Sequence, residues 1–180
     1  MASIYCTKKL FAHLKQPVPI PRGVEPSAAF EVWYANLILL GRVKHILCCE
    51  AMTNCYLLIP AKVIHSKGDI TAQLEQLIRG AGVNILARAD LTADQIVALL
   101  KGFKEIQLEY HHNRHILGLM NDAVFYLKDC WESGIRDLST LEDGLMRRLQ
   151  SDGNGSYQTP FHAINKLLSK TEAKYDQSRP

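Results

Sequence analysis

The sequence predicts an α+β fold: an antiparallel sheet with a central hairpin, packed by several helices and followed by a helical C-terminal part. The hairpin is indicated by two apolar runs, 33–40 and 43–49, separated by only two residues, of which Gly41 can adopt a positive φ angle. A third apolar run, 55–59, ends at a proline, which cannot donate an amide hydrogen bond inside a sheet. Beyond it the apolar residues change to helical spacing. We therefore expect a three-stranded antiparallel meander covered by helices.

The chain before the hairpin predicts a strand, a short helix and an extended connection. Residues 3–6 are β-prone, and Thr7 is a suitable N-cap for a helix over 8–15, whose apolar residues fall on one face. The next segment, 16–26, contains four prolines, whose fixed φ angle and missing amide exclude helix and central strand. In 33–40 both alternating sets of side chains are mostly apolar, so we expect this strand to be covered on both faces.

Two helices are predicted after the meander. The first begins after Asp69, a plausible N-cap, and we expect Gly80 and Gly82 to stop it. The second begins after Thr92, which forms a capping box with Gln95. Both segments have apolar residues at three-and-four spacing, so each helix presents one face to the core.

The next part of the chain returns to strand spacing and then to helices. Residues 104–110 alternate between apolar and polar side chains, which predicts a strand at a sheet edge, with 111–115 as the following turn. From Ile116 the three-and-four spacing indicates the strongest helix of the sequence. Ser139 and Glu142 have the form of a capping box for the helix after it.

The C-terminal part predicts a polar loop over 151–156 and a last amphipathic helix. Thr159 is a suitable N-cap, and Pro160 fits the first helical position. We expect residues 1–150 to form a single α+β domain. Residues 151–180 would add a loop and a helix that packs on this domain or serves association, with a frayed tail.

Length and composition indicate one ordinary globular domain. The chain has 180 residues, of which 47% are hydrophobic and 22% charged, and its formal net charge of +3 neither requires nor excludes an anionic partner. The five cysteines are odd in number and lack CxxC spacing, which favours reduced thiols and a cytoplasmic location. No apolar run reaches the roughly 18 residues of a membrane span, so we expect no membrane partner, while a homo-oligomer stays possible.

Patterns for catalysis or metal binding are incomplete. His111, His112 and His115 would share a metal only on a helix, and we place them at a strand end and turn, so no metal site is predicted. Cys48, Cys49 and Cys55 are interpreted as small buried apolar residues. No glycine motif for nucleotide phosphates is present, so we predict no cofactor and assign no catalytic residue. The basic residues available to an anionic partner are Lys8, Lys9, Arg42, Lys44, Arg147 and Arg148.

Three stretches of the chain resemble one family when they are taken together. They are CTKKL at 6–10, WYANL at 33–37 and RHILGLMND at 114–122. In this order they are similar to a bacterial family of small proteins classed as a domain of unknown function, with CTKKL, WxANL and LGxMN motifs. The resemblance covers residues 4–132 and implies no established activity, cofactor or catalytic residue.

The resemblance points to six candidate binding residues, which are Lys8, Lys9, Trp33, Asn36, Arg114 and Asn121. Three of them are charged, and the two asparagines interrupt apolar segments, so core packing alone does not explain the set. The competing interpretation is that Asn36 and Asn121 satisfy backbone groups between the hairpin and the strong helix.

Because no complete catalytic pattern is present, we expect an uncharacterised cytoplasmic binding or regulatory module with a protein or nucleic-acid partner. The alternative is an enzyme acting on a phosphate-containing or nucleic-acid substrate. In that case Lys8, Lys9 and Arg114 would bind the anion, and a histidine from 111–115 would act as base. The alternative predicts that these residues converge in one pocket.

Overall fold

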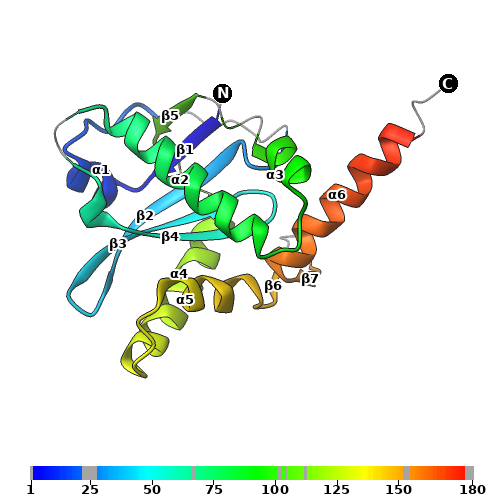
Figure 1. Ribbon diagram of the computed structural model, residues 1–180. Helices are drawn as coiled ribbons and strands as arrows, with labels where there is room; N and C mark the ends of the chain where they lie inside the picture. Colours follow the sequence, from blue (N-terminus) through cyan, green and yellow to red (C-terminus); the bar gives the residue numbers. More distant parts are fainter. Residues whose placement is uncertain are drawn as a thin grey trace.

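The computed structural model describes residues 2–21, 28–65, 68–100, 103, 105–111, 113–151 and 155–176. At its centre is a five-stranded sheet with the strand order β4–β3–β2–β1–β5, and helices lie on both of its faces (Figure 1). The strands of this sheet are β1 (Ala2–Cys6), β2 (Val32–Leu40), β3 (Val43–Glu50), β4 (Tyr56–Pro60) and β5 (Ile106–Glu109). The helices are α1 (Lys8–Leu14), the 3-10 turn η1 (Ala61–Val63), α2 (Ile70–Ala87), α3 (Ala93–Leu100), α4 (Arg114–Glu132), α5 (Leu138–Met146) and α6 (Pro160–Asp176). A small second sheet pairs β6 (Gln150–Ser151) with β7 (Tyr157–Gln158).

The main sheet is mixed, so the predicted antiparallel sheet is only partly right. Strands β2, β3 and β4 form an antiparallel meander, and β2 and β3 pair from Trp33–Glu50 to Leu40–Val43. Strand β1, however, runs parallel to both of its neighbours, β2 and β5. The physical reason is the connection: α1 and the segment after it carry the chain back to the starting end of the sheet, which yields a parallel pair instead of a hairpin.

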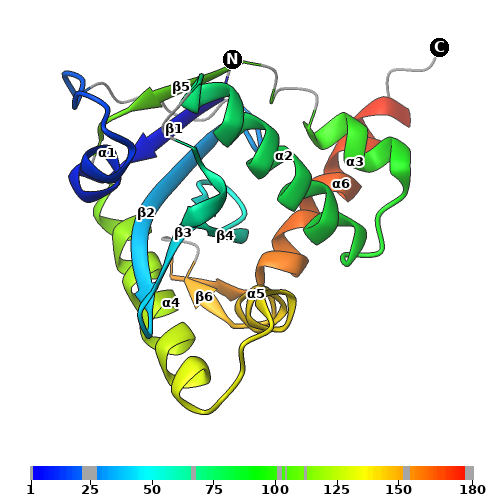
Figure 2. The same ribbon diagram turned by 60° about the vertical axis from the view of Figure 1, so that its left-hand side comes forward.

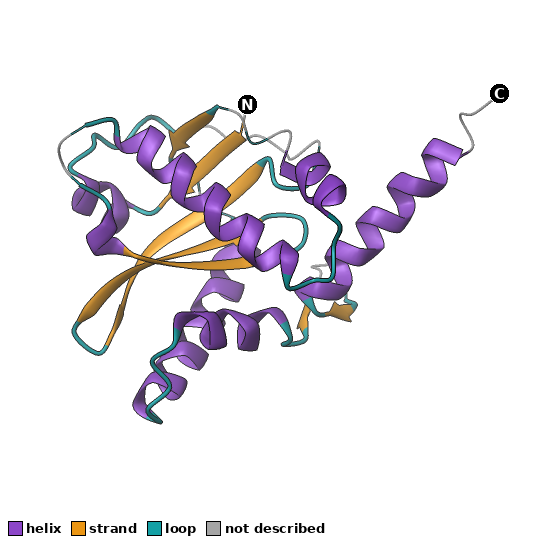
Figure 3. Cartoon of the chain, in the orientation of Figure 1, coloured by secondary structure: helices purple, strands orange, loops and turns teal. Residues whose placement is uncertain are grey.

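The two faces of the sheet are covered by different helices, as Figure 3 shows. Side chains of α1, α2 and α3 pack with one set of strand residues, among them Ala35 and Cys48. Those of α4 and α5 pack with the alternate set, among them Tyr34 and Cys49. Strand β2 is therefore covered on both faces, as its two-sided apolarity predicts.

Several helix starts follow the local signals in the sequence. The Thr7 side chain caps α1 by accepting from the Leu10 amide, and Thr92 and Gln95 hydrogen-bond each other's backbone amides at the start of α3. Thr159 accepts from the His162 amide at the start of α6, with Pro160 in the first helical position. These ends are set by contacts within four residues, which is why the sequence alone predicts them.

The predicted stop of α2 is wrong, because the helix continues through Gly80 and Gly82 to Ala87. Gly82 is buried, and a β-carbon there would lie 3.6 Å from the Leu100 side chain of α3. Contact with α3 and burial of the apolar face therefore offset the roughly 1 kcal/mol that each glycine costs a helix.

Two other helix starts differ from the prediction. Helix α4 begins at Arg114, two residues before Ile116, because the Asn113 side chain accepts from the first free amides of the helix. Helix α5 is capped by Asp137 and not by Ser139. Its Glu142 cannot reach back to complete a capping box, since this carboxylate is bound to a strand amide on the sheet.

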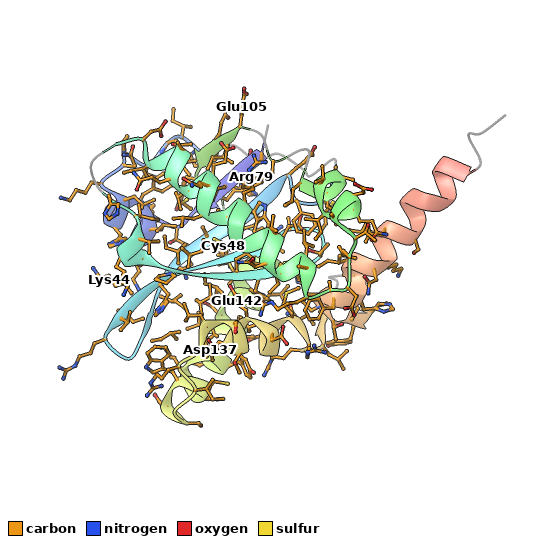
Figure 4. All side chains as sticks on the ribbon, viewed as in Figure 1. Lys44, Cys48, Arg79, Glu105, Asp137 and Glu142 are labelled. Carbon is orange, nitrogen blue, oxygen red and sulfur yellow. The ribbon has the colours of Figure 1, made fainter. Side chains whose placement is uncertain are left out.

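The edge of the sheet at β4 is closed by α5. Alternate amides of an edge strand point away from the sheet and need partners when they are buried. The Leu58 amide donates to Glu142 Oε1 at 2.8 Å, and the Tyr56 amide lies 3.4 Å from Met146 Sδ. The next residue in this alternation is Pro60, which has no amide. Glu142, labelled on α5 in Figure 4, also accepts from Arg88 at 2.8 Å, so one carboxylate joins the end of α2, α5 and the sheet.

The opposite edge, β5, borders a groove of about 550 Å³. Its wall includes the exposed segment after α1, where Ile20 is 82% exposed. Among the described helices, none is long and apolar enough to cross a membrane.

Candidate functional site

The carboxyl ends of β1 and β5 lie side by side, because the two strands are parallel neighbours with Tyr5 opposite Glu109. After β1 the chain enters α1 on one face of the sheet, and after β5 it enters α4 on the other face (Figure 2). Ligands of open sheets commonly bind where two parallel strands send their connections to opposite faces. This end of the sheet is therefore the first place to look for a site.

A polar cluster joins parts of all three family-like stretches at this end. The Thr7 hydroxyl, after β1, donates to Asn36 Oδ1 of β2 at 3.0 Å. The Asn113 side chain, which caps α4, also hydrogen-bonds the Tyr34 hydroxyl of β2. Burial, followed by the neighbouring Tyr5, raises the pKa of Tyr34 to about 12, so this hydroxyl stays protonated. The cluster holds the starts of α1 and α4 against the same strand.

Two ring contacts lie beside this cluster. Lys8 Nζ is 5.5 Å from the centroid of the Tyr110 ring, and the His111 ring is 5.3 Å from that of Tyr5. Arg114 follows in the first turn of α4 with an exposed side chain. Lys8, Asn36 and Arg114 are therefore brought to one end of the sheet, as a common site would require. His112 lies outside the described residues.

The positive charge at this end comes mainly from two stretches of the chain that contain no carboxylate. Residues 2–21 and 32–49 contain no aspartate or glutamate, although the chain has 18 of them, and their five lysines and arginines are all exposed. Helix α1 and the tip of the β2–β3 hairpin lie at the same end of the molecule (Figure 1). Burial and the nearby Lys44 charge lower the pKa of His13, which places the hairpin close to α1. We name as the basic face the exposed side chains of Lys8, Lys9, Lys15, Arg42, Lys44 and Arg114.

The helix starts at this end are partly occupied by their own capping side chains. Three of the first amides of α1 and α4 donate to the capping side chains: Leu10 to Thr7, and His115 and Ile116 to Asn113. The exposed side-chain cations of the basic face are therefore the main groups offered to an anion here.

One acidic group lies next to the basic face. Glu109 ends β5, and its Oε2 atom is buried without a hydrogen-bond partner in the described structure. A carboxylate oxygen of this kind can accept from an amine, amide or hydroxyl of a ligand.

Trp33 and Asn121, the other two candidates from the sequence, lie elsewhere. Trp33 is fully buried, and its indole N–H donates to the Phe30 carbonyl at 3.1 Å. Asn121 is exposed on α4, two turns beyond Arg114. Its neighbour Asp122 lines a separate cleft between α4 and α5.

Sequence reasoning missed Asn113 and Tyr110 as members of the site. Asn113 could have been found, because asparagine directly before a helical pattern is a common N-cap. Tyr110 could not, since its contact with Lys8 depends on the parallel pairing of β1 with β5.

Four buried cysteines of the described part of the chain have thiols that are poorly suited to act as nucleophiles. Cys48, Cys49 and Cys55 are fully buried, as predicted, and burial raises the pKa of each well above its usual value. Burial likewise raises the pKa of Cys6 to about 12, so this thiol does not ionise at neutral pH. No group of three potential metal-ligating side chains is found among the residues that the structure describes.

A family model described as a domain of unknown function, DUF6933, matches residues 3–163. Among curated proteins and solved structures, no match to the chain was found. The family match extends beyond the 4–132 of the sequence resemblance and includes α5 and the start of α6. The chain belongs to this family.

Proposed function

We propose that this member of the family is a cytoplasmic binding module that holds a nucleic acid on its basic face. The observation that carries the proposal is charge segregation: two neighbouring segments with five exposed cations contain no carboxylate. The distribution of charge on a surface matters more for phosphate binding than the net charge, which here is only +3.

The arrangement fits a polymer better than a single phosphate. The exposed cations extend from α1 to the tip of the β2–β3 hairpin, and capping side chains already accept from some of the amides at the helix starts. A backbone with many phosphates can contact several such cations at once, and each contact releases a counterion. The cluster of Thr7, Asn36 and Asn113 fixes the relative positions of these elements.

The test is a fluorescence anisotropy titration of labelled single- and double-stranded oligonucleotides at several salt concentrations. The variant Lys8→Gln/Lys9→Gln is compared with Arg147→Gln/Lys166→Gln, which removes the same charge from exposed residues elsewhere. We expect the first variant to lose on the order of tenfold in affinity, with a smaller salt dependence, and the second to behave like the parent.

Two outcomes would contradict the proposal. Binding that is absent, or that does not change with salt, would exclude a phosphate-backbone contact. Equal binding of poly-glutamate and of oligonucleotides would point to an acidic protein partner instead.

A second candidate is an enzyme that acts on a phosphate-containing or nucleic-acid substrate. It is favoured by one observation, that Lys8 and Arg114 flank the strand end where His111 lies. Release of product from labelled oligonucleotides, abolished by His111→Gln with unchanged binding, would favour this candidate over a module that only binds.

A further inference from the structure

A second concave site lies on the far part of α4, away from the basic face. It is a cleft of about 210 Å³ between α4, α5 and the small β6–β7 sheet. Its apolar wall is formed by Leu119, Ala123 and Leu145, and its polar groups come from the side chains Tyr56, Asp122, Arg148, Gln150, Ser151 and Tyr157. Apolar walls with a few convergent polar groups are typical of small-molecule sites.

The Arg148 guanidinium in this cleft is positioned by a tyrosine ring and has no carboxylate partner among the described residues. Its central carbon lies 4.6 Å from the centroid of the Tyr126 ring, and no carboxylate lies within 4.0 Å of it among the described residues. Tyr126 in turn packs over Gly144 of α5, where a β-carbon would collide with the tyrosine. A guanidinium held in this way presents a fork of donors that matches a carboxylate.

An acidic group lies in the same cleft and is not paired with that arginine. Asp122 projects from α4, and no basic side chain lies within 4.0 Å of its carboxylate in the described structure. The Tyr56 hydroxyl donates to Gln150 Oε1 at 3.2 Å, and the charges of both Asp122 and Arg148 act on this hydroxyl. The Asp122 carboxylate and the Arg148 guanidinium therefore both lie near the Tyr56 hydroxyl, and each can still contact a ligand.

We propose that this cleft binds a small zwitterion, an α-amino acid with an apolar side chain. Arg148 would hold the carboxylate, Asp122 the ammonium group, and the wall of Leu119, Ala123 and Leu145 the side chain. The volume of about 210 Å³ is below the roughly 300 Å³ at which drug-sized pockets begin, which suits a molecule of amino-acid size. A doubly charged ligand explains why the cleft offers both signs of charge.

The proposal is tested by isothermal titration calorimetry of the full chain with L-leucine and L-phenylalanine. Two matched probes each lack one charge of leucine: isoamylamine has no carboxylate, and 4-methylpentanoate has no amine. We expect at least one of the two amino acids to bind, and both single-charge probes to bind at least tenfold more weakly.

Two variants test whether Arg148 and Asp122 bind the charged groups of the amino acid. Arg148→Gln and Asp122→Asn should each weaken amino-acid binding at least tenfold. Two exposed controls should not change it: Arg147→Gln, next to Arg148 in the chain, and Asp129→Asn, further along α4. Circular dichroism melting curves confirm that each variant is folded. The proposal is overturned if neither amino acid binds at millimolar concentration, or if binding survives both cleft substitutions. Since the probes are not nucleic acids, this result is independent of the proposal for the basic face.

Discussion

The basic face and the Arg148 cleft differ in how the chain assembles them. The basic face comes mainly from two segments of the first third of the chain, joined by the hydrogen bond between Thr7 and Asn36. The cleft is built from four separate segments, with Tyr56, Asp122, Arg148 and Tyr157 as examples. Charge of one sign over an open surface suits a polymer, whereas opposite charges in a small cleft suit a single molecule. A substitution that disrupts α5 should therefore weaken binding in the cleft and leave binding at the basic face unchanged.

The largest effect is expected from Glu142→Ala. The substitution leaves the buried Leu58 amide and the Arg88 guanidinium without this acceptor, which should lower the free energy of unfolding by about 3 kcal/mol in urea denaturation. Because α5 forms one wall of the cleft, amino-acid affinity should fall, while oligonucleotide affinity of the folded protein should not.

The control for this substitution is Glu132→Ala, which removes an exposed glutamate at the end of α4 and should change stability by less than about 0.5 kcal/mol. Equal stabilities of the two variants would mean that Glu142 does not hold α5 on the sheet. A parallel loss of both binding activities would mean that the two sites are not independent.

A smaller effect is expected at Asn36, where two substitutions distinguish a structural role of this residue from a role in ligand binding. Asn36→Leu removes the acceptor of the Thr7 hydroxyl and should cost about 1 kcal/mol of unfolding free energy. Asn36→Asp keeps an acceptor there but adds negative charge beside the basic face. It should therefore retain more stability than the leucine variant, while oligonucleotide affinity at low salt falls several-fold. Unchanged affinity in the aspartate variant would place the ligand away from this cluster.

Gly144→Ala should affect the cleft with little change in stability. A β-carbon at this position collides with Tyr126, whose ring must move, and the Arg148 guanidinium loses its stacking surface. We expect weaker amino-acid binding and a change in stability within about 1 kcal/mol, since alanine also favours the helix by a similar amount. Gly118→Ala is the matched control, because no atom lies within 4 Å of a β-carbon there. Equal amino-acid affinities in the two variants would contradict the role given to Tyr126.

The smallest effect is a pH dependence at the start of α5. Hydrogen bonds from Ser139 and Thr140 lower the pKa of Asp137 from 3.8 to about 2. A carboxylate with a lowered pKa stabilises the fold above its unfolded-state pKa, and this contribution disappears as the pH falls from about 4 to 2. The melting temperature of Asp137→Ala should thus be below that of the parent at pH 6, and the difference should shrink towards pH 2. A difference that is constant with pH would show that the charge of Asp137 is not involved.

The features that could be predicted from the sequence are those fixed by neighbouring residues. Thr7, Thr92 and Thr159 cap their helices through contacts a few residues away, and the two-sided apolarity of β2 correctly predicts that both of its faces are covered. Five of the six cations of the basic face lie in two continuous segments of the sequence, although the small net charge of the whole chain obscures this pattern.

The features that could not be predicted depend on residues far apart in the chain. Parallel pairing of β1 with β5 brings Lys8 to Tyr110, and contact with α3 carries α2 through its glycines. Glu142 has the spacing of a capping box but binds Leu58, 84 residues away. The cleft gives no signal in the sequence at all, since each of its segments is unremarkable until the fold brings them together.

The way α5 closes the β4 edge also determines how copies of this protein could meet. The strand from Tyr56 to Pro60 offers no free outward amide, because two are bound by α5 and the third position is a proline. A strand from another molecule therefore has nothing to pair with on that side, which protects the sheet from fibrous growth. Any lengthening of the sheet by an incoming chain must begin at β5, beside the groove that contains Ile20.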